Sequence, residues 1–177
     1  GNTGISFLSD LQFRNGVLLG NEFINVRQIR DGGLVKIDLA TGQAVEKKNF
    51  DSDEVPVVEN GGLSLDPVTG VLWGIETTGL VPRIFQIDPV SGEASAPVFL
   101  LKNGQALTFG FGGLGILDGR FYGTRDGKGS VSGNQEIYRI DQVTGEVRLL
   151  DIDFGGITGG INGLDVFVDA GGVDPPP

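Results

Sequence analysis

An internal repeat of about 50 residues is the feature that most constrains what this chain can fold into. Three segments, GLVKIDLATG, RIFQIDPVSG and IYRIDQVTG, align without gaps through a shared turn. The shared aspartate falls at Asp38, Asp88 and Asp141, which gives spacings of 50 and 53 residues. In each segment a short apolar run precedes the turn, which is typical of a β-strand that enters a hairpin.

A second set of segments lies between these: DLQFRNGVLLGNE, GLSLDPVTGVLWGIE and GLGILDGRFYGTRD. Each consists of an alternating apolar run, a tight turn and a second run, and the turns are Asn15-Gly16, Asp66 to Gly70 and Asp118-Gly119. Asparagine and aspartate hydrogen-bond their own backbone at such turns, and glycine takes the left-handed conformation that closes them. Each of these segments therefore predicts a β-hairpin.

Each repeat is then two hairpins, or four strands, and no segment has the apolar periodicity of a helix. The repeats cover about residues 4–50, 60–101 and 110–154, and the apolar run from Ile161 to Val168 predicts one extra strand before the Pro-rich tail 174–177. Four-stranded repeats of this length are typical of β-propeller blades. We expect an all-β, β-propeller-like single domain over 1–177, with three four-stranded antiparallel repeats of about 50 residues and an extra C-terminal strand.

The segments GLSLDPVTGVLWGIE and IFQIDPVSG resemble the repeats of secreted bacterial β-propeller-like proteins, which are built on G-L-x-x-D-P-x-T-G-x-L-Y/W-G and I-Y-x-I-D-P-x-T-G. The resemblance covers almost the whole chain and implies an exported protein. Closed propellers have typically four to eight blades, whereas this chain supplies three and a strand. Three arrangements follow as alternatives: further blades in a longer precursor, free blade faces covered by other chains, or an open arrangement of the sheets.

Composition narrows the range of functions. The 177 residues include 23 acidic and 13 basic ones, a formal charge of −10, which disfavours nucleic acid as a partner because phosphate contacts need Lys and Arg. No apolar run is long enough to predict a membrane span. The chain has no Cys and no His, which excludes thiol nucleophiles, Ser-His-Asp triads and His-ligated zinc or haem. It also has no Met and begins at Gly1, from which we expect a processed protein. The resemblance of its repeats to secreted proteins implies a location outside the cell or on its surface.

Several conspicuous side chains have a structural interpretation. We expect the turn residues Asp38, Asp66, Asp88 and Asp141 to be held by local hydrogen bonds and not to form a carboxylate cluster. Trp73 and Tyr122 with Phe121 occupy matching places in consecutive repeats, which favours packing between sheets over a carbohydrate-stacking surface. The arginines are expected to pair with neighbouring acids.

One loop has the oxygen ligands of a candidate calcium site. The segment DGKGSVSGNQE places side-chain oxygens at Asp126, Ser130, Ser132 and Glu136, although Lys128 occupies one ligand position. A surface loop is the alternative, and the acidic run Asp51, Asp53 and Glu54 is a second weak candidate. Calcium is therefore the candidate cofactor, and no catalytic residue or organic cofactor is predicted.

Two segments are candidates for subunit contacts. A lone strand has unpaired backbone groups on both edges, so the strand 161–168 must pair within its own chain or add to the sheet of a neighbour. The apolar, Gly-rich stretch LTFGFGGLG indicates a contact patch. The contact residues expected from these two segments are Ile161, Leu164, Val166, Val168, Phe109, Phe111 and Leu114.

These features favour a non-catalytic extracellular protein, structural or adhesive, that acts through subunit contacts and forms a homo-oligomer, a filament or a surface layer. A glycan- or small-ligand-binding propeller module is the alternative. A calcium-dependent hydrolase is the third hypothesis, weakened by the absence of His.

Overall fold

The computed structural model describes residues 8–22, 33–50, 60–77, 81–125, 136–152 and 164. Within these ranges the chain is all-β, with fourteen strands and no helix. The strands are β1 (Leu8–Arg14), β2 (Val17–Glu22), β3 (Gly33–Ile37), β4 (Ala44–Asn49), β5 (Asn60–Leu65), β6 (Leu72–Glu76), β7 (Arg83–Ile87), β8 (Ala94–Phe99), β9 (Leu101–Lys102), β10 (Gln105–Ala106), β11 (Phe111–Leu117), β12 (Arg120–Arg125), β13 (Ile137–Ile140) and β14 (Val147–Leu149). No helix among the described residues is long and apolar enough to cross a membrane.

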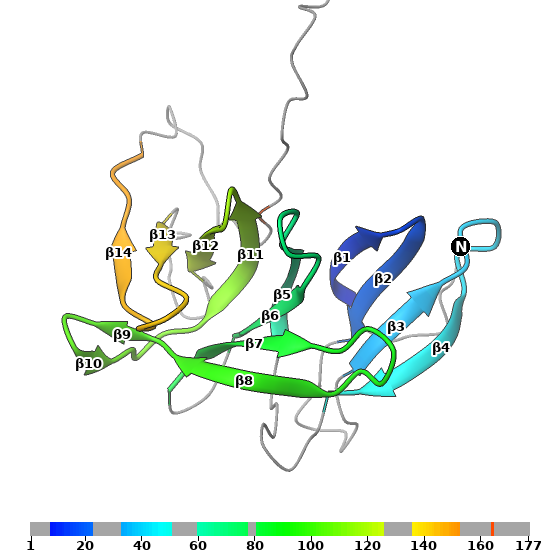
Figure 1. Ribbon diagram of the computed structural model, residues 1–177, viewed down its shortest axis with the longest axis horizontal. Coiled ribbons are helices and arrows are strands. Elements are labelled where there is room, and N and C mark those ends of the chain that lie inside the picture. Colours follow the sequence, from blue (N-terminus) through cyan, green and yellow to red (C-terminus); the bar gives the residue numbers. More distant parts are fainter. Residues whose placement is uncertain are drawn as a thin grey trace, which may run out of the picture.

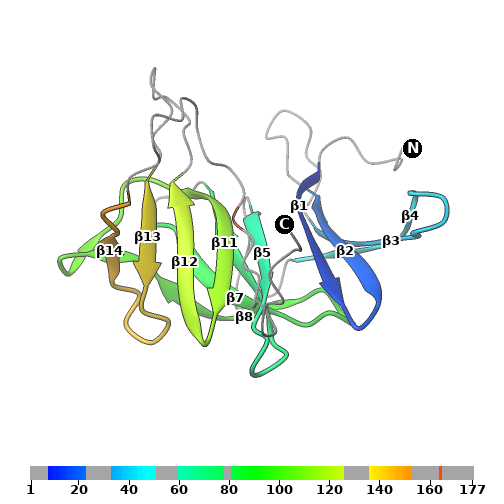
Figure 2. The ribbon, with the colours of Figure 1, turned by 90° about the horizontal axis from the view of Figure 1, so that it is seen from above.

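Twelve of these strands form three four-stranded antiparallel sheets, each in simple sequential order. The first sheet is β1–β4, the second sheet is β5–β8 and the third sheet is β11–β14 (Figure 1). The strands β1, β5 and β11 lie side by side, and from them the sheets spread outward (Figure 2). The predicted all-β class is confirmed. The predicted strand 161–168 lies outside the described residues except for Leu164, which is half-buried and is not assigned to a strand.

The β3–β4, β7–β8 and β13–β14 turns owe their shape to their aspartates. The carboxylates of Asp38, Asp88 and Asp141 each accept hydrogen bonds from the backbone N–H groups two and three residues on, at 2.7–3.1 Å. Those backbone hydrogen bonds lower the pKa of each carboxyl below its ordinary value. The turn glycines Gly42, Gly92 and Gly145 have φ of 70–83°, which only glycine adopts readily. The local interpretation of these aspartates is confirmed.

A short hairpin, β9–β10, follows the second sheet and was not predicted. Its turn is Asn103-Gly104, with both residues at positive φ. Glu146 accepts hydrogen bonds from the backbone N–H groups of both turn residues, which ties this hairpin to the third sheet.

The core lies in two clusters, one at each boundary between sheets. We call the boundary between the first and second sheets the first junction, and that between the second and third sheets the second junction. The first junction packs Leu19 and Leu34 against Leu63, Leu72 and Phe85. The second junction packs a larger set, which includes Trp73, Ile75, Ile84, Phe111, Leu114, Phe121 and Tyr138.

Candidate functional site

Of the four predicted calcium ligands, the structure describes only Glu136. The other three, Asp126, Ser130 and Ser132, lie outside the described residues. Oε2 of Glu136 accepts a hydrogen bond from Nη1 of Arg125 at 2.8 Å and another from the Tyr138 hydroxyl at 3.1 Å. Burial raises the pKa of Glu136, but these two hydrogen bonds and the nearby positive charges outweigh it and leave the pKa below its ordinary value. The carboxylate is therefore ionised and already neutralised by a cation of the chain itself.

Aromatic rings surround this ion pair. The Arg125 guanidinium lies 4.4 Å from the centre of the Phe109 ring, and the Lys102 ammonium lies 5.4 Å from the centre of Tyr138. Burial, together with the hydrogen bond to Glu136, raises the pKa of Tyr138 to about 12. A calcium ion that used Glu136 would have to displace Arg125 from its carboxylate. Calcium binding by the loop stays a prediction.

The same kind of ion pair recurs in all three sheets at the end of the second strand. In the second sheet Arg83 donates two hydrogen bonds of 2.9 Å to the carboxylate of Glu76, and both side chains are largely buried. In the first sheet Glu22 pairs with Lys47. The third sheet reverses the order, since Arg125 stands on β12 where the other two have glutamate. This recurrence indicates that Glu136 serves the architecture of the repeat, and it confirms the expected pairing for Arg83 and Arg125.

The predicted contact patch does not form a surface. Phe111 and Leu114 are fully buried on β11, against the second sheet, and Phe109 is partly buried under Arg125. The Gly-rich sequence allows β5 and β11 to approach closely: a Cβ on Gly62 would lie 2.6 Å from the backbone nitrogen of Leu114. These residues belong to the core, which corrects the expectation that they contact another subunit. Of the other expected contact residues, Ile161, Val166 and Val168 lie outside the described residues.

An apolar surface does occur on the first sheet, where the sequence analysis did not expect one. Leu11 is paired with Gly20 across β1 and β2, as Leu63 is with Gly74 and Leu114 with Gly123 in the other sheets. Leu63 and Leu114 are 2% and 1% exposed, whereas Leu11 is 50% exposed. Its neighbour Phe13 on the same face is 55% exposed. We call this surface, which consists of Leu11, Phe13 and the half-buried Leu18, the outer apolar face.

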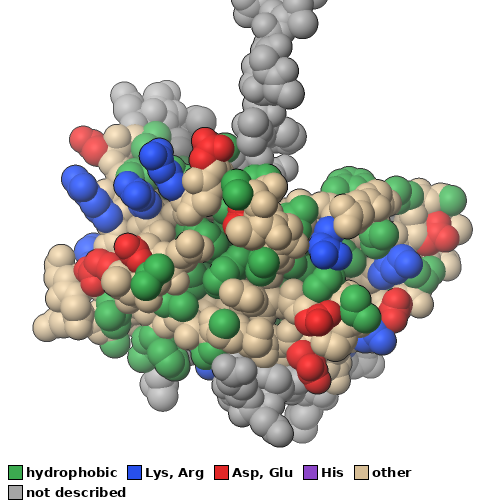
Figure 3. Space-filling view, in the orientation of Figure 1, with side chains coloured by type: hydrophobic (Ala, Val, Ile, Leu, Met, Phe, Trp, Pro, Cys, Tyr) green, Lys and Arg blue, Asp and Glu red, His purple; other side chains and the backbone are tan. Residues whose placement is uncertain are grey.

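The opposite end of the stack carries basic side chains instead. Arg139 is paired with Tyr122 on one side and with Arg148 on the other, so the three share one face of the third sheet. Arg120 lies two residues from Tyr122 and therefore on the same face. The three arginines are exposed, and Figure 3 shows basic side chains gathered over β12, β13 and β14.

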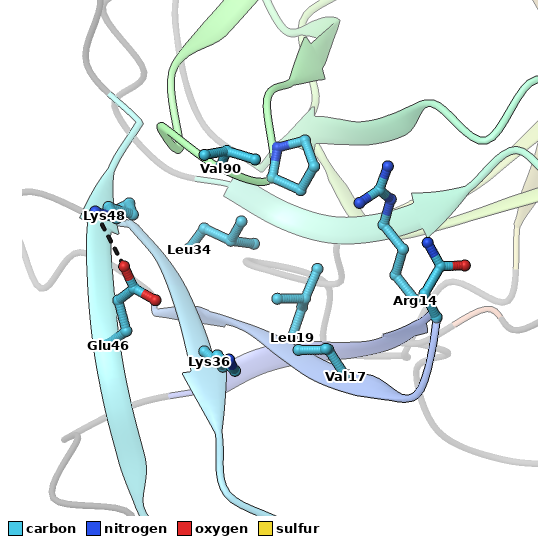
Figure 4. Close-up of a pocket in the computed structure, with 10 residues that line it drawn as sticks. Arg14, Val17, Leu19, Leu34, Lys36, Glu46, Lys48 and Val90 are labelled. Carbon is cyan, nitrogen blue, oxygen red and sulfur yellow. Dashed lines mark ion pairs between the residues drawn. The ribbon is translucent and has the colours of Figure 1, made fainter.

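A pocket of about 280 Å³ lies at the first junction (Figure 4). Its apolar lining comes from Val17, Leu19 and Leu34 of the first sheet and from Pro89 and Val90 of the β7–β8 turn. Three cations of the first sheet, Arg14, Lys36 and Lys48, line it together with one acid, Glu46, which pairs with Lys48 at 3.0 Å. We call it the junction pocket. The sequence analysis did not predict it, because the pocket is assembled from two repeats.

No chemistry-bearing group stands out elsewhere in the described residues. Three or more carboxylates in a metal-binding arrangement do not occur within the described ranges. Trp73 packs edge-on against Phe121, with ring centres 5.0 Å apart, as the core interpretation predicted. The same interpretation is wrong for Tyr122, which is only half-buried and lies beside Arg139 on the outer face of the third sheet. The candidate sites among the described residues are therefore the outer apolar face of the first sheet, the basic face of the third sheet and the junction pocket.

No protein-family model matches this chain, and no curated protein is similar in sequence. Two solved structures match over 89% of the chain at 10% identity and a TM-score of 0.50: the "Structure of U3-55K", of which the match covers 42%, and the "Crystal structure of RRP9 WD40 repeats", of which it covers 41%. A luciferin-regenerating enzyme is similar over 77% of the chain at 15% identity and a TM-score of 0.48. The chain thus spans less than half the length of these structures. At such low identity the likeness concerns the fold alone, and it is to proteins of the WD40 and propeller type.

Proposed function

We propose that this chain is a non-catalytic structural protein that acts outside the cell through contacts between its subunits, with propeller-like blades as the contact units. The outer apolar face carries this proposal. Soluble proteins seldom leave a leucine and a phenylalanine side by side and half exposed on a sheet without a partner for that surface.

Equivalent positions in the other two sheets support this reasoning. Leu63 and Leu114 stand where Leu11 does, and a neighbouring sheet covers each of them. The face that carries Leu11 and Phe13 thus has the composition of a surface that another sheet covers. Covering it removes apolar area from water, which stabilises an assembly by roughly 25 cal/mol per Å² of that area. The extracellular location rests on the resemblance of the repeats to those of secreted bacterial proteins.

The proposal is tested by sedimentation velocity of the complete chain over a wide concentration range. We expect the unmodified chain to form oligomers or filaments, and we expect Leu11→Glu with Phe13→Glu to leave monomers. Val143→Glu is the matched control, because Val143 is highly exposed on a turn away from this face. A chain that stays monomeric at the highest concentration would refute the proposal.

Assembly by strand addition is a separate route, which involves the predicted strand 161–168. Deletion of residues 161–177 separates the two routes. If the deletion dissolves the assembly while the double glutamate variant does not, the strand is the contact; the reverse result assigns the contact to the outer apolar face.

A further inference from the structure

One of the residues that line the junction pocket, Leu19, differs in size from its counterpart in the next repeat. Leu19 is the third residue of VLLGNE, and Trp73 is the third residue of VLWGIE. Each lies one place before the glycine that pairs with the leucine of the preceding strand. At the second junction the indole of Trp73 is buried and packs on Phe121. At the first junction Leu19 leaves space open between its own sheet and the β7–β8 turn. The pocket of about 280 Å³ therefore lies beside the position at which the second sheet has a tryptophan.

The cations around the pocket have no counterpart in the second sheet. By the pairing of the strands, Lys36 corresponds to Gln86 and Lys48 to Val98 in the second sheet, and Arg14 stands at the place of Asp66. The second sheet therefore folds the same way with an amide, an apolar side chain and an acid at these places. Because the fold does not require three cations there, their presence needs another reason.

The charge balance at the pocket remains positive in a chain of net charge −10. Glu46 neutralises Lys48, and Asp88 on the β7–β8 turn interacts electrostatically with Arg14. Among the described residues, Lys36 has no ion-pair partner within 4 Å. Two of the three cations face acids, and Lys36 is the cation that a ligand would find available.

We propose that the junction pocket binds a small organic anion that carries a flat apolar ring, such as an aryl carboxylate. The ring occupies the space that Trp73 fills at the other junction and contacts Leu19, Leu34 and Pro89. The carboxylate lies toward the cationic lining, where Lys36 and Arg14 donate charge-assisted hydrogen bonds. A pocket of this volume is at the small end of ligand sites, which fits a one- or two-ring compound. This inference does not depend on the assembly proposed above.

The test is a calorimetric titration of the complete chain with 2-naphthoate, and with 2-naphthalenemethanol as its uncharged counterpart. We expect one saturable site for the acid and much weaker binding of the alcohol. Lys36→Gln introduces the residue of the second sheet and should weaken binding about tenfold, because one charge-assisted hydrogen bond is lost. Arg139→Gln is the matched control: it removes a cation from the same strand position of the third sheet, far from the pocket, and should leave binding unchanged.

Leu19→Trp gives the sharper result, since it places the second sheet's own residue in the pocket. It should abolish binding, and circular dichroism reports whether the variant is folded. The inference is overturned if the unmodified chain shows no saturable site, if folded Leu19→Trp binds the acid as well as the unmodified chain does, or if Lys36→Gln and Arg139→Gln have equal effects. Equal binding of the acid and the alcohol would overturn the role of the cations.

Discussion

Each of the two junctions joins two four-stranded sheets through their first strands, β1 with β5 and β5 with β11, yet the two are packed differently. At the second junction the inner strands β5 and β11 touch through glycine, and Trp73 with Phe121 fills the space farther out. At the first junction Asp10 stands on β1 where β5 has Gly62, and its Oδ2 accepts a hydrogen bond of 2.8 Å from the backbone N–H of Leu63. Gln12 does the same for Leu65 at 3.2 Å. At the first junction, polar side chains thus lie between the two inner strands. At the second junction, the inner strands are in backbone contact and aromatic rings fill the remaining space.

The same repeat therefore forms two kinds of junction, one that is filled and one that contains a pocket. A filled junction contributes mainly to stability, since interiors are packed to the density of organic crystals. A spaced junction gives up part of that packing and gains a pocket with its own charge. Leu19, Lys36 and Lys48 line the pocket on strands whose order is the same as in the second sheet.

The largest expected effect is the loss of an aromatic ring at the second junction. Phe121→Ala removes the ring on which Trp73 packs and should lower the free energy of unfolding by about 4 kcal/mol. Leu72→Ala, at the equivalent position of the second sheet and facing the first junction, should cost about 2 kcal/mol. Urea unfolding of both variants measures the two values. Equal losses would remove the distinction between a filled and a spaced junction.

The next effect concerns the inner strands. Gly62→Ala places a Cβ 2.6 Å from the backbone nitrogen of Leu114, where backbone cannot yield cheaply, and should cost about 1–3 kcal/mol. Asp10→Ala, at the equivalent place of the first junction, meets no such contact. It removes instead the acceptor of the Leu63 N–H, at a cost of about 1–3 kcal/mol.

Asp10→Asn separates the two causes, because the amide oxygen can still accept that hydrogen bond. Asp10→Asn should therefore keep most of the unfolding free energy that Asp10→Ala loses. At Gly62, every side chain larger than hydrogen should lower the free energy of unfolding. Full stability of Gly62→Ala in urea would contradict the close approach of β5 and β11.

A smaller effect is a pH dependence confined to the second junction. The pKa of Tyr138 is raised to about 12 from 10.0, so the folded state holds the phenolic proton more tightly than the unfolded state does. The stability that this provides is complete below pH 10 and is lost as the pH rises through about 12. The urea midpoint of the unmodified chain should therefore fall over this interval by more than that of Tyr138→Phe. An identical alkaline decline in both proteins would show that Tyr138 does not carry it.

The turns and hairpins could be predicted from the sequence because their causes are local. An aspartate that bonds the next two or three backbone N–H groups, followed by a glycine at positive φ, requires no knowledge of the rest of the fold. The β9–β10 hairpin has the same kind of local cause in its Asn103-Gly104 turn, although the sequence analysis did not predict it. Trp73 and Phe121 were assigned correctly to the core, whereas Tyr122, which has the place of Trp73 in the third sheet, is only half-buried and lies beside Arg139.

The surfaces could not be predicted in the same way. Period-two alternation separates the two faces of a strand, but it does not say which neighbouring sheet covers each face. The sequence around Phe111 and Leu114 was therefore interpreted as a contact surface, although its glycines serve the approach of β11 to β5. Residue-by-residue alignment of the first hairpins would have placed Leu11 with Leu63 and Leu19 with Trp73. That alignment was the available signal for the outer apolar face and the junction pocket.

A reciprocal exchange, Leu19→Trp and Trp73→Leu, each followed by urea unfolding, tests most directly whether the first junction is open and the second filled. Because the pocket can accept the indole, we expect Leu19→Trp to change the free energy of unfolding by less than about 1 kcal/mol. Trp73→Leu, which leaves a cavity beside Phe121, should cost about 3 kcal/mol. If Leu19→Trp costs as much as an overpacked core, or if Trp73→Leu costs nothing measurable, the two junctions do not differ as described.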